Sequence, residues 1–236
     1  MSRLLRTLCL LAMTVILFCS SAYAGGTISD EERFRRERSE MVEEQIQSRG
    51  IKDKRLLQAM GTVPRHEFVP ADMRQMAYID TPLPIGEGQT ISSPYNTALM
   101  IELAEIKPRQ KILEVGTGSG YQAALLAQLT DQVYTIESQP ALALRADTAL
   151  QKLGYENVHL RMGDGSKGWP EEAPFDTILM TSVAGSLPQP LIDQLVEGGV
   201  LIVPAGSFQR SPEFHRLQKK NGQMVEEKIS HEKSLE

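Results

Sequence analysis

From residue 111 onward, short apolar runs alternate with longer stretches of mixed polarity. Short apolar runs that are bounded by glycine, proline or polar residues are typical of buried strands, and the longer stretches between them have the length of helices. The pattern predicts five strands, over residues 111–115, 132–136, 158–162, 175–181 and 200–203. It predicts helices between them over residues 121–129, 141–153 and 189–196.

Strands that alternate with helices in this way form a parallel sheet covered on both faces. After the last of these strands, residues 214–219 and 224–229 flank Asn221-Gly222, a dipeptide typical of tight hairpin turns. We therefore expect a Rossmann-like, doubly wound, mostly parallel α/β sheet that ends in an antiparallel hairpin. Ligands of such sheets bind at the carboxyl ends of the strands.

The chain before residue 111 is predicted to be helical at first. Residues 30–48 are highly charged with few apolar positions, which indicates a surface helix closed by Gly50. A second short helix is expected over residues 56–60, ended by Gly61 and Pro64.

Residues 80–94 are rich in proline and glycine, which predicts a loop. A helix should follow over residues 94–105, because Ser93 suits the N-cap position and Pro94 the first helical position.

The first 24 residues have the pattern of a secretory signal peptide. Arg3 and Arg6 precede an apolar run over residues 8–18, and Ala22-Tyr23-Ala24 supplies small residues before Gly25. The apolar run is shorter than the roughly 20 residues of a membrane-spanning helix. The alternative is an uncleaved N-terminal anchor. We expect residues 1–24 to be this leader, residues 25–79 a helical extension, and residues 80–236 the domain that contains the α/β sheet.

Composition narrows the class of protein further. Hydrophobic residues make up 41% of the chain and charged residues 23%, an ordinary globular balance, and the formal net charge is −5. Such a chain is a poor candidate for nucleic-acid binding, which depends on Lys and Arg. The two cysteines, Cys9 and Cys19, both lie in the leader, and the four histidines are scattered, so no metal site is predicted.

Three groups of residues follow predicted strands. Gly116-Thr117-Gly118-Ser119-Gly120 follows the first strand, Glu137 the second, and Asp164-Gly165 the third. Alternate glycines allow a tight turn and a close approach of the backbone to a ligand, although a purely structural turn is the alternative. A carboxylate at Glu137 can accept hydrogen bonds from both hydroxyls of a ribose, or be an ordinary surface Glu. Asp164 can contact an adenine amine or simply shape a turn.

Together these groups indicate an adenosine cofactor. The glycine spacing is G-x-G-x-G, whereas the dinucleotide fingerprint is G-x-G-x-x-G, which disfavours a dehydrogenase. The first strand ends Glu114-Val115-Gly116, and a Gly-Asp pair follows the third strand. These features resemble the class I S-adenosylmethionine-dependent methyltransferases. The fourth strand ends Met180-Thr181-Ser182-Val183 and lacks the Asn-Pro-Pro-aromatic cluster that such enzymes use to methylate amino groups.

A second set of motifs specifies the family. The sequence from Leu83 to Pro94, LPIGEGQTISSP, resembles the signature of the protein-L-isoaspartate O-methyltransferases. Further matches span roughly Met41 to Gly206, including VPRHEFVP over residues 63–70 and APFD over residues 173–176. The resemblance implies a repair enzyme that methylates the α-carboxylate of L-isoaspartyl (and D-aspartyl) residues in damaged proteins. The ester then closes to a succinimide, which can open to normal Asp.

This chemistry requires positioning and no strong base. A carboxylate acceptor, whose pKa is ordinarily roughly 4, is already ionised at neutral pH. The resemblance places the active-site serine at Ser92, which we assign to holding the acceptor or the cofactor and not to nucleophilic attack. It implies that Gln89, Thr90 and Ile91 line the same site. It also implies that the glycine loop passes under the cofactor methionine, and that Glu137 and Asp164-Gly165 hold its ribose and adenine.

Two departures leave an alternative open. Family members end in one more strand, whereas residues 229–236 are polar, so an unpaired sheet edge is expected. The leader predicts export, to the periplasm or the medium. The alternative is a cytoplasmic protein, because S-adenosylmethionine is made in the cytoplasm. The alternative function is an exported, catalytically weak relative that binds damaged protein or nucleoside. His66 and Trp169 are interpreted as structural, and a monomer is expected.

Overall fold

The structure is a computed structural model that describes residues 29–181, 187–205 and 213–227. The predicted leader therefore lies outside the described residues. Residues Met1–Arg33 and Phe34–Glu236 separate into two units, and the second unit contains the sheet and all the predicted site residues.

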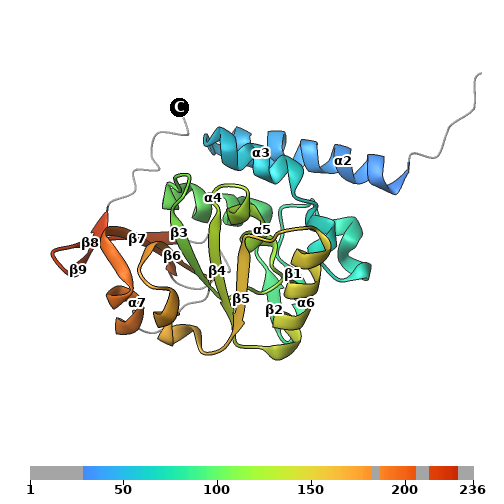
Figure 1. Ribbon diagram of the computed structural model, residues 1–236. Coiled ribbons are helices and arrows are strands. Elements are labelled where there is room, and N and C mark those ends of the chain that lie inside the picture. The colour runs from blue at the N-terminus through green and yellow to red at the C-terminus, as the bar shows by residue number, and fades with distance from the viewer. Residues whose placement is uncertain (1–28, 182–186, 206–212, 228–236) are drawn as a thin grey trace, which may run out of the picture. The chain divides into compact units, whose positions relative to one another are not determined.

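The centre of the second unit is a seven-stranded sheet with the order β5-β4-β3-β6-β7-β8-β9 (Figure 1). The first five strands in this order are parallel, and β8 and β9 are antiparallel to their neighbours. The strands are β3 (Lys111–Val115), β4 (Gln132–Glu137), β5 (Val158–Met162), β6 (Phe175–Met180), β7 (Leu195–Ala205), β8 (Glu213–Lys220) and β9 (Gln223–Glu227). The predicted doubly wound sheet with a closing hairpin is confirmed.

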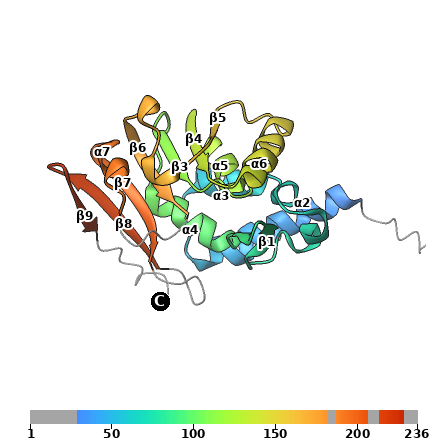
Figure 2. The ribbon, with the colours of Figure 1, turned by 90° about the horizontal axis from the view of Figure 1, so that it is seen from below.

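Both faces of the sheet are covered (Figure 2). Helices α4 (Pro94–Ala104), α5 (Tyr121–Ala127) and α6 (Pro140–Lys152) belong to the apolar core on one face, and α7 (Gln189–Asp193) belongs to the core on the other. Neighbouring residues of β3 show why: Ile112 joins the first core and Leu113 the second. Side chains alternate along a strand, so a strand that is apolar throughout must be covered on both sides.

The helices before the sheet differ from the prediction in detail. Helix α2 (Asp30–Glu40) continues into a π-helical segment, Met41–Ile46, and a 3₁₀ turn, Gln47–Arg49, and ends at Gly50 with φ of 98°. Helix α3 (Lys54–Thr62) is longer than expected, because the Asp53 carboxylate caps it earlier and Gly61 is tolerated inside it. The 3₁₀ turns Arg65–Phe68 and Ala71–Met76 follow.

The prediction of a loop over residues 80–94 was wrong for residues 83–86 and 89–91. Strands β1 (Leu83–Gly86) and β2 (Gln89–Ile91) form a two-stranded antiparallel sheet. Its turn uses Glu87 and Gly88, both with positive φ (53° and 71°), as tight hairpin turns require. Immediately afterwards the Ser93 side chain accepts the Asn96 N–H and caps α4, as predicted.

The carboxyl-terminal half holds two further corrections. Helix α7 ends at Asp193 and β7 already begins at Leu195, which pairs with Phe175, so Gly198-Gly199 lies inside β7 instead of preceding it. Leu195 pairs with Phe175 and Val200 with Thr177, so the register of β7 shifts across the segment that contains the two glycines. The outer edge of β7 is paired with β8 from Val200 to Ala205, so the expected unpaired edge does not occur there.

Among the described helices, none has both the length and the apolar composition required to cross a membrane.

Candidate functional site

A cavity of about 180 Å³ opens at the carboxyl ends of β3, β4 and β6, between the glycine loop and the segment that carries Ser92. This is the edge at which a parallel α/β sheet binds its ligand. The predicted site residues that line it are Gln89, Thr90, Ile91, Ser92, Gly116, Thr117, Gly118, Ser119 and Glu137. The structure therefore brings together residues from three separate parts of the sequence.

Gly116, the first residue of the glycine loop, stands at a position that only glycine can occupy without strain. Its φ is 99°, and a Cβ atom on this residue would lie 2.2 Å from Thr181 Oγ1. The Thr181 hydroxyl donates to the carbonyls of Gly116 and Val115 at 2.9 and 3.1 Å, and the Gly116 N–H donates to Ile136 O at 2.8 Å. The loop is thus held by the ends of both strands that flank β3.

Glu137 lies at the end of β4 with only 6% of its surface exposed. Its Oε2 accepts the Gly118 N–H at 2.8 Å, and its Oε1 accepts the Gln139 N–H at 2.9 Å. Oε1 also accepts the Ser138 hydroxyl in a long contact of 3.5 Å. A carboxylate has about four lone-pair positions, so one remains free for a ligand, on Oε2. The same side chain therefore fixes the glycine loop and presents an acceptor at the cavity wall.

Three predicted cofactor residues do not line this cavity. Gly120 has φ of 88° and faces α6, where a Cβ atom would lie 3.3 Å from Ala146 Cβ, so its role is to let α5 and α6 pack closely. Asp164 is exposed, and its Oδ1 accepts the Ser166 N–H and hydroxyl at 3.0 and 2.7 Å. It lines a neighbouring cavity of about 260 Å³, and Gly165 follows it at the start of a 3₁₀ turn.

The two adjacent serines have different surroundings. Ser93 is buried and caps α4, whereas Ser92 is half-buried and lines the cavity. The Ser92 carbonyl accepts a hydrogen bond from Arg65 Nη2 at 2.7 Å. The cap is thus provided by Ser93, and Ser92 lines the cavity.

The sequence did not single out Glu114 as a site residue, although it precedes the glycine loop. Glu114 is fully buried, lines the cavity, and accepts the Thr135 hydroxyl at 2.6 Å. Burial raises its pKa to about 8, and the Thr135 hydroxyl and the nearby Gln122 amide only partly offset this effect. Its other oxygen, Oε1, has no hydrogen-bond partner among the residues that the structure describes.

Other cavity residues were also missed. They are Thr97, Tyr121, Gln122, Ser138, Gln139, Leu142 and Thr181. Thr181 and Ser138 were discoverable, because each lies at the carboxyl end of a parallel strand, and such positions meet at the ligand-binding edge. The others depend on how helices α4, α5 and α6 begin beside that edge.

The raised pKa of Glu114 makes a prediction for stability. Between the ordinary pKa of 4.5 and about 8, the folded protein holds a proton that the unfolded chain has released. The free energy of unfolding therefore falls as the pH rises through this window, by a few kcal/mol in order of magnitude. Glu114→Gln, which stays neutral, should lose this dependence and be more stable than the native protein at pH 8.

Denaturant unfolding of both proteins at several pH values between 5 and 8 measures this difference. The exposed Glu156→Gln serves as the control and should leave the pH dependence unchanged. An equal slope for the native protein and Glu114→Gln would show that Glu114 is ionised in the folded state.

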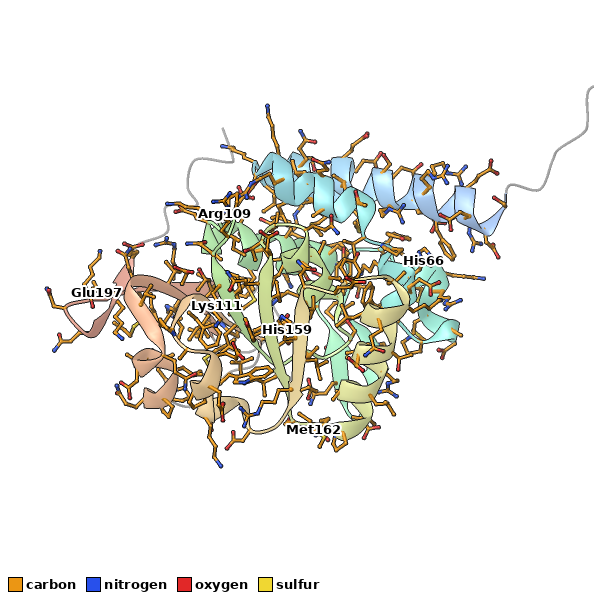
Figure 3. The ribbon with its side chains drawn as sticks, in the orientation of Figure 1. His66, Arg109, Lys111, His159, Met162 and Glu197 are labelled. Carbon is orange, nitrogen blue, oxygen red and sulfur yellow. The ribbon has the colours of Figure 1, made fainter. Side chains whose placement is uncertain are left out.

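His66 and Trp169 have structural surroundings. His66 is buried, its Nδ1 lies 2.7 Å from the Tyr78 hydroxyl, and its ring stacks on Phe34 at 4.1 Å. Figure 3 shows it well apart from Met162, which marks the carboxyl end of β5. Trp169 packs edge-on against Tyr134, with ring centroids 5.5 Å apart. Across the described parts of the chain, no group of three or more His, Cys, Asp or Glu side chains is arranged to hold a metal ion.

The parallel sheet, the glycine loop after β3 and the acid at the end of β4 define a protein of the class I methyltransferase fold. Comparisons with known proteins agree. The family described as "Protein-L-isoaspartate(D-aspartate) O-methyltransferase (PCMT)" matches residues 36–233. The chain therefore belongs to the protein-L-isoaspartate(D-aspartate) O-methyltransferase family.

Curated relatives cover most of the chain. The Protein-L-isoaspartate O-methyltransferase 1 of Syntrophobacter fumaroxidans is 56% identical over 73% of this chain and 81% of its own length. The Protein-L-isoaspartate O-methyltransferase of Opitutus terrae is 54% identical over 79% of this chain and 80% of its own length.

Solved structures give the same result. One protein-L-isoaspartate O-methyltransferase has a TM-score of 0.69 and 27% identity, and the match covers 83% of this chain and 64% of that one, slightly under two thirds of its length. A putative protein-L-isoaspartate O-methyltransferase from Plasmodium falciparum, in complex with S-adenosyl-L-homocysteine, has a TM-score of 0.69 and 26% identity. That match covers 81% of this chain and 94% of the other.

Proposed function

We propose that this protein transfers a methyl group from S-adenosylmethionine to the α-carboxylate of L-isoaspartyl (and D-aspartyl) residues in damaged proteins. The observation that carries the proposal is a single cavity in which Ser92, from the family signature, faces the glycine loop and Glu137. Family membership and relatives that bear this name over most of their length support the same activity.

The cavity residues fit S-adenosylmethionine. Glu137 retains one free acceptor position on Oε2 for a ribose hydroxyl, and a second hydroxyl can replace the long Ser138 contact at Oε1. The backbone of Gly116 can approach a ligand closely. Three buried polar atoms of cavity-lining residues lack a hydrogen-bond partner among the described residues: Glu114 Oε1, Tyr121 OH and Gln122 Nε2. Buried polar groups are normally satisfied, so these atoms are suited to a polar ligand.

When bound, S-adenosylmethionine supplies an electrophilic methyl group on a sulfonium. The acceptor carboxylate is ionised at neutral pH, so the protein need not remove a proton. The task of the chain is alignment of the acceptor oxygen with the methyl group, which can lower the barrier by several kcal/mol, up to about 7–11 in ideal cases. Ser92 and the backbone around it hold the acceptor, while Gly116–Gly118 and Glu137 hold the cofactor.

Labelled methyl transfer tests the activity. Purified protein is incubated with methyl-labelled S-adenosylmethionine and with peptides that differ only in carrying Asp or isoaspartate at one position. Label on the isoaspartyl peptide alone is the expected result. Binding of S-adenosylhomocysteine without label on either peptide would instead support the alternative, a relative that binds without efficient transfer.

Ser92→Ala should lower kcat by about tenfold to a hundredfold while binding S-adenosylhomocysteine as tightly as the native protein. The reason is that one hydrogen bond to a charged acceptor contributes about 1.5–3 kcal/mol. Steady-state rates with the isoaspartyl peptide measure the effect, and Ser93→Ala is the matched control, since it should affect stability through the α4 cap. Full activity of Ser92→Ala would remove Ser92 from the mechanism.

We further propose that the protein is exported and that it acts as a monomer. The support for export is the order of basic residues, apolar run and small residues over residues 1–24. Cell fractionation and the mass of the mature chain test this point, and an N-terminus at Gly25 is expected. A full-length protein in the cytoplasm would contradict export. Light scattering tests the second proposal: the mass of a monomer is expected, and the mass of an oligomer would contradict it.

A further inference from the structure

Arg65, from the segment VPRHEFVP, connects the buried interior to the wall of the cavity. It is 0% exposed, and it lies in the 3₁₀ turn Arg65–Phe68, outside the cavity itself. Its Nη2 donates to the Ser92 carbonyl at 2.7 Å, and its Nε donates to the Ala77 carbonyl at 2.8 Å. The two bonds fix the planar guanidinium in one orientation, because both come from the same rigid fork.

The Arg65 side chain also contacts Tyr121, a second residue of the cavity wall. The Arg65 guanidinium carbon lies 4.8 Å from the centroid of the Tyr121 ring, and Tyr121 lines the cavity. Arg65 therefore contacts both Ser92, on the acceptor side, and Tyr121, which follows the glycine loop.

The charge of Arg65 is not neutralised by an ion pair with any carboxylate that the structure describes. Asp80, an acid whose field acts on it, is occupied by Arg49 at 2.5 Å and by the Tyr95 N–H at 2.9 Å. Burial lowers the pKa of Arg65, but a guanidinium remains protonated in proteins. Burying a cation without a counter-charge costs folding free energy unless a negatively charged group approaches it. Here the guanidinium donates directly to the backbone carbonyl of Ser92, which lines the cavity.

We propose that Arg65 is a positioning residue of the methyl-acceptor site, which orients the Ser92 backbone and supplies positive potential for an anionic acceptor. The inference rests on the proposed function, because it takes the acceptor to be a carboxylate held beside Ser92. It assigns Arg65 no contact with the cofactor. Its loss should therefore weaken acceptor binding and leave cofactor binding intact.

Arg38 offers a matched control. It is also nearly buried, with 8% exposed, and it likewise binds a backbone carbonyl, Gly61 O, at 2.8 Å. Its Nη1 donates to the Tyr78 hydroxyl at 3.2 Å, and the residue does not line the cavity. Arg38→Met thus removes a comparable buried guanidinium from the same part of the molecule.

The test compares Arg65→Met, Arg65→Lys and Arg38→Met in the full-length protein. For each, KM and kcat are measured with an isoaspartyl peptide, the affinity for S-adenosylhomocysteine by calorimetry, and the unfolding midpoint. Arg65→Met should raise the peptide KM by about tenfold or more with S-adenosylhomocysteine affinity unchanged. Arg65→Lys keeps the positive charge but lacks the planar guanidinium fork, so its peptide KM should lie between those of the native protein and Arg65→Met. Arg38→Met should lower the unfolding midpoint and leave the peptide KM, kcat and the affinity for S-adenosylhomocysteine unchanged.

An unchanged peptide KM in Arg65→Met, or an equal rise of KM in Arg38→Met, would overturn the role of Arg65. If Arg65→Met does not fold, Arg65→Lys carries the test, and a native peptide KM in that variant would overturn it. Failure of the proposed function has a different signature, because the native protein would then transfer no methyl group to the isoaspartyl peptide.

Discussion

Replacing Gly116 with alanine should weaken the binding of S-adenosylhomocysteine by roughly a hundredfold and lower methyl transfer with it. The new Cβ would lie 2.2 Å from Thr181 Oγ1, and the residue would have to keep a φ of 99°. Overpacking and a strained backbone each cost about 1–3 kcal/mol. The loop can relieve both only by moving away from the positions that line the cavity. Calorimetric titration with S-adenosylhomocysteine measures the loss.

Two companion variants make this prediction specific. Gly61→Ala lies inside α3 with open space around it, so it should leave binding unchanged and stabilise the helix slightly. Adding Thr181→Ala to Gly116→Ala removes the steric contact but not the strained φ, so part of the affinity should return. Native affinity in Gly116→Ala alone would show that the loop does not contact the cofactor.

Glu137→Gln should lower the affinity for S-adenosylhomocysteine by about a hundredfold or more. Hydrogen bonds to a charged acceptor contribute about 1.5–3 kcal/mol each, and we assign two ribose hydroxyls to this carboxylate. The amide that replaces one oxygen would also face either the Gly118 or the Gln139 N–H, donor against donor. Calorimetry measures the affinity, and the unfolding midpoint separates a ligand effect from a loss of loop structure.

The control for Glu137→Gln is Glu171→Gln, which removes a negative charge from an exposed acid paired with Arg161. It should bind S-adenosylhomocysteine like the native protein. If both variants lose affinity equally, general charge, and not the position of Glu137, would account for the effect.

The sheet was predictable from sequence because its central strands are apolar on both faces. Ile112 and Leu113 enter opposite cores, so the run over residues 111–115 shows no alternation and indicates a covered parallel strand. The hairpin at Asn221-Gly222 was predictable for a local reason, since its residues suit two positive φ angles.

The failures have a physical cause in common. Proline and glycine over residues 80–94 correctly indicated a turn, but the flanking residues pair only because β1 and β2 meet across it. Similarly, β7 extends back to Leu195 because Phe175 of β6 is available to pair with it. Local composition does not report such partners.

The site was predictable where a residue directly follows a strand or lies in the family signature. Glu137, the loop Gly116–Ser119 and the segment Gln89–Ser92 line one cavity. Asp164 and Gly120 were also chosen by motif, but the first faces a neighbouring cavity and the second faces α6. Arg65 acts through a single backbone carbonyl 27 residues away in sequence, a contact that only the folded chain reveals.

The most direct test of the central claim is repair itself. A purified isoaspartyl peptide is incubated with the protein and S-adenosylmethionine at neutral pH, and its products are followed by chromatography and mass spectrometry. A methyl ester should form, close to the succinimide and yield the normal Asp peptide, whereas the matched Asp peptide should stay unchanged. If the protein binds S-adenosylhomocysteine but the isoaspartyl peptide acquires no ester, the account of this chain as a repair methyltransferase is contradicted.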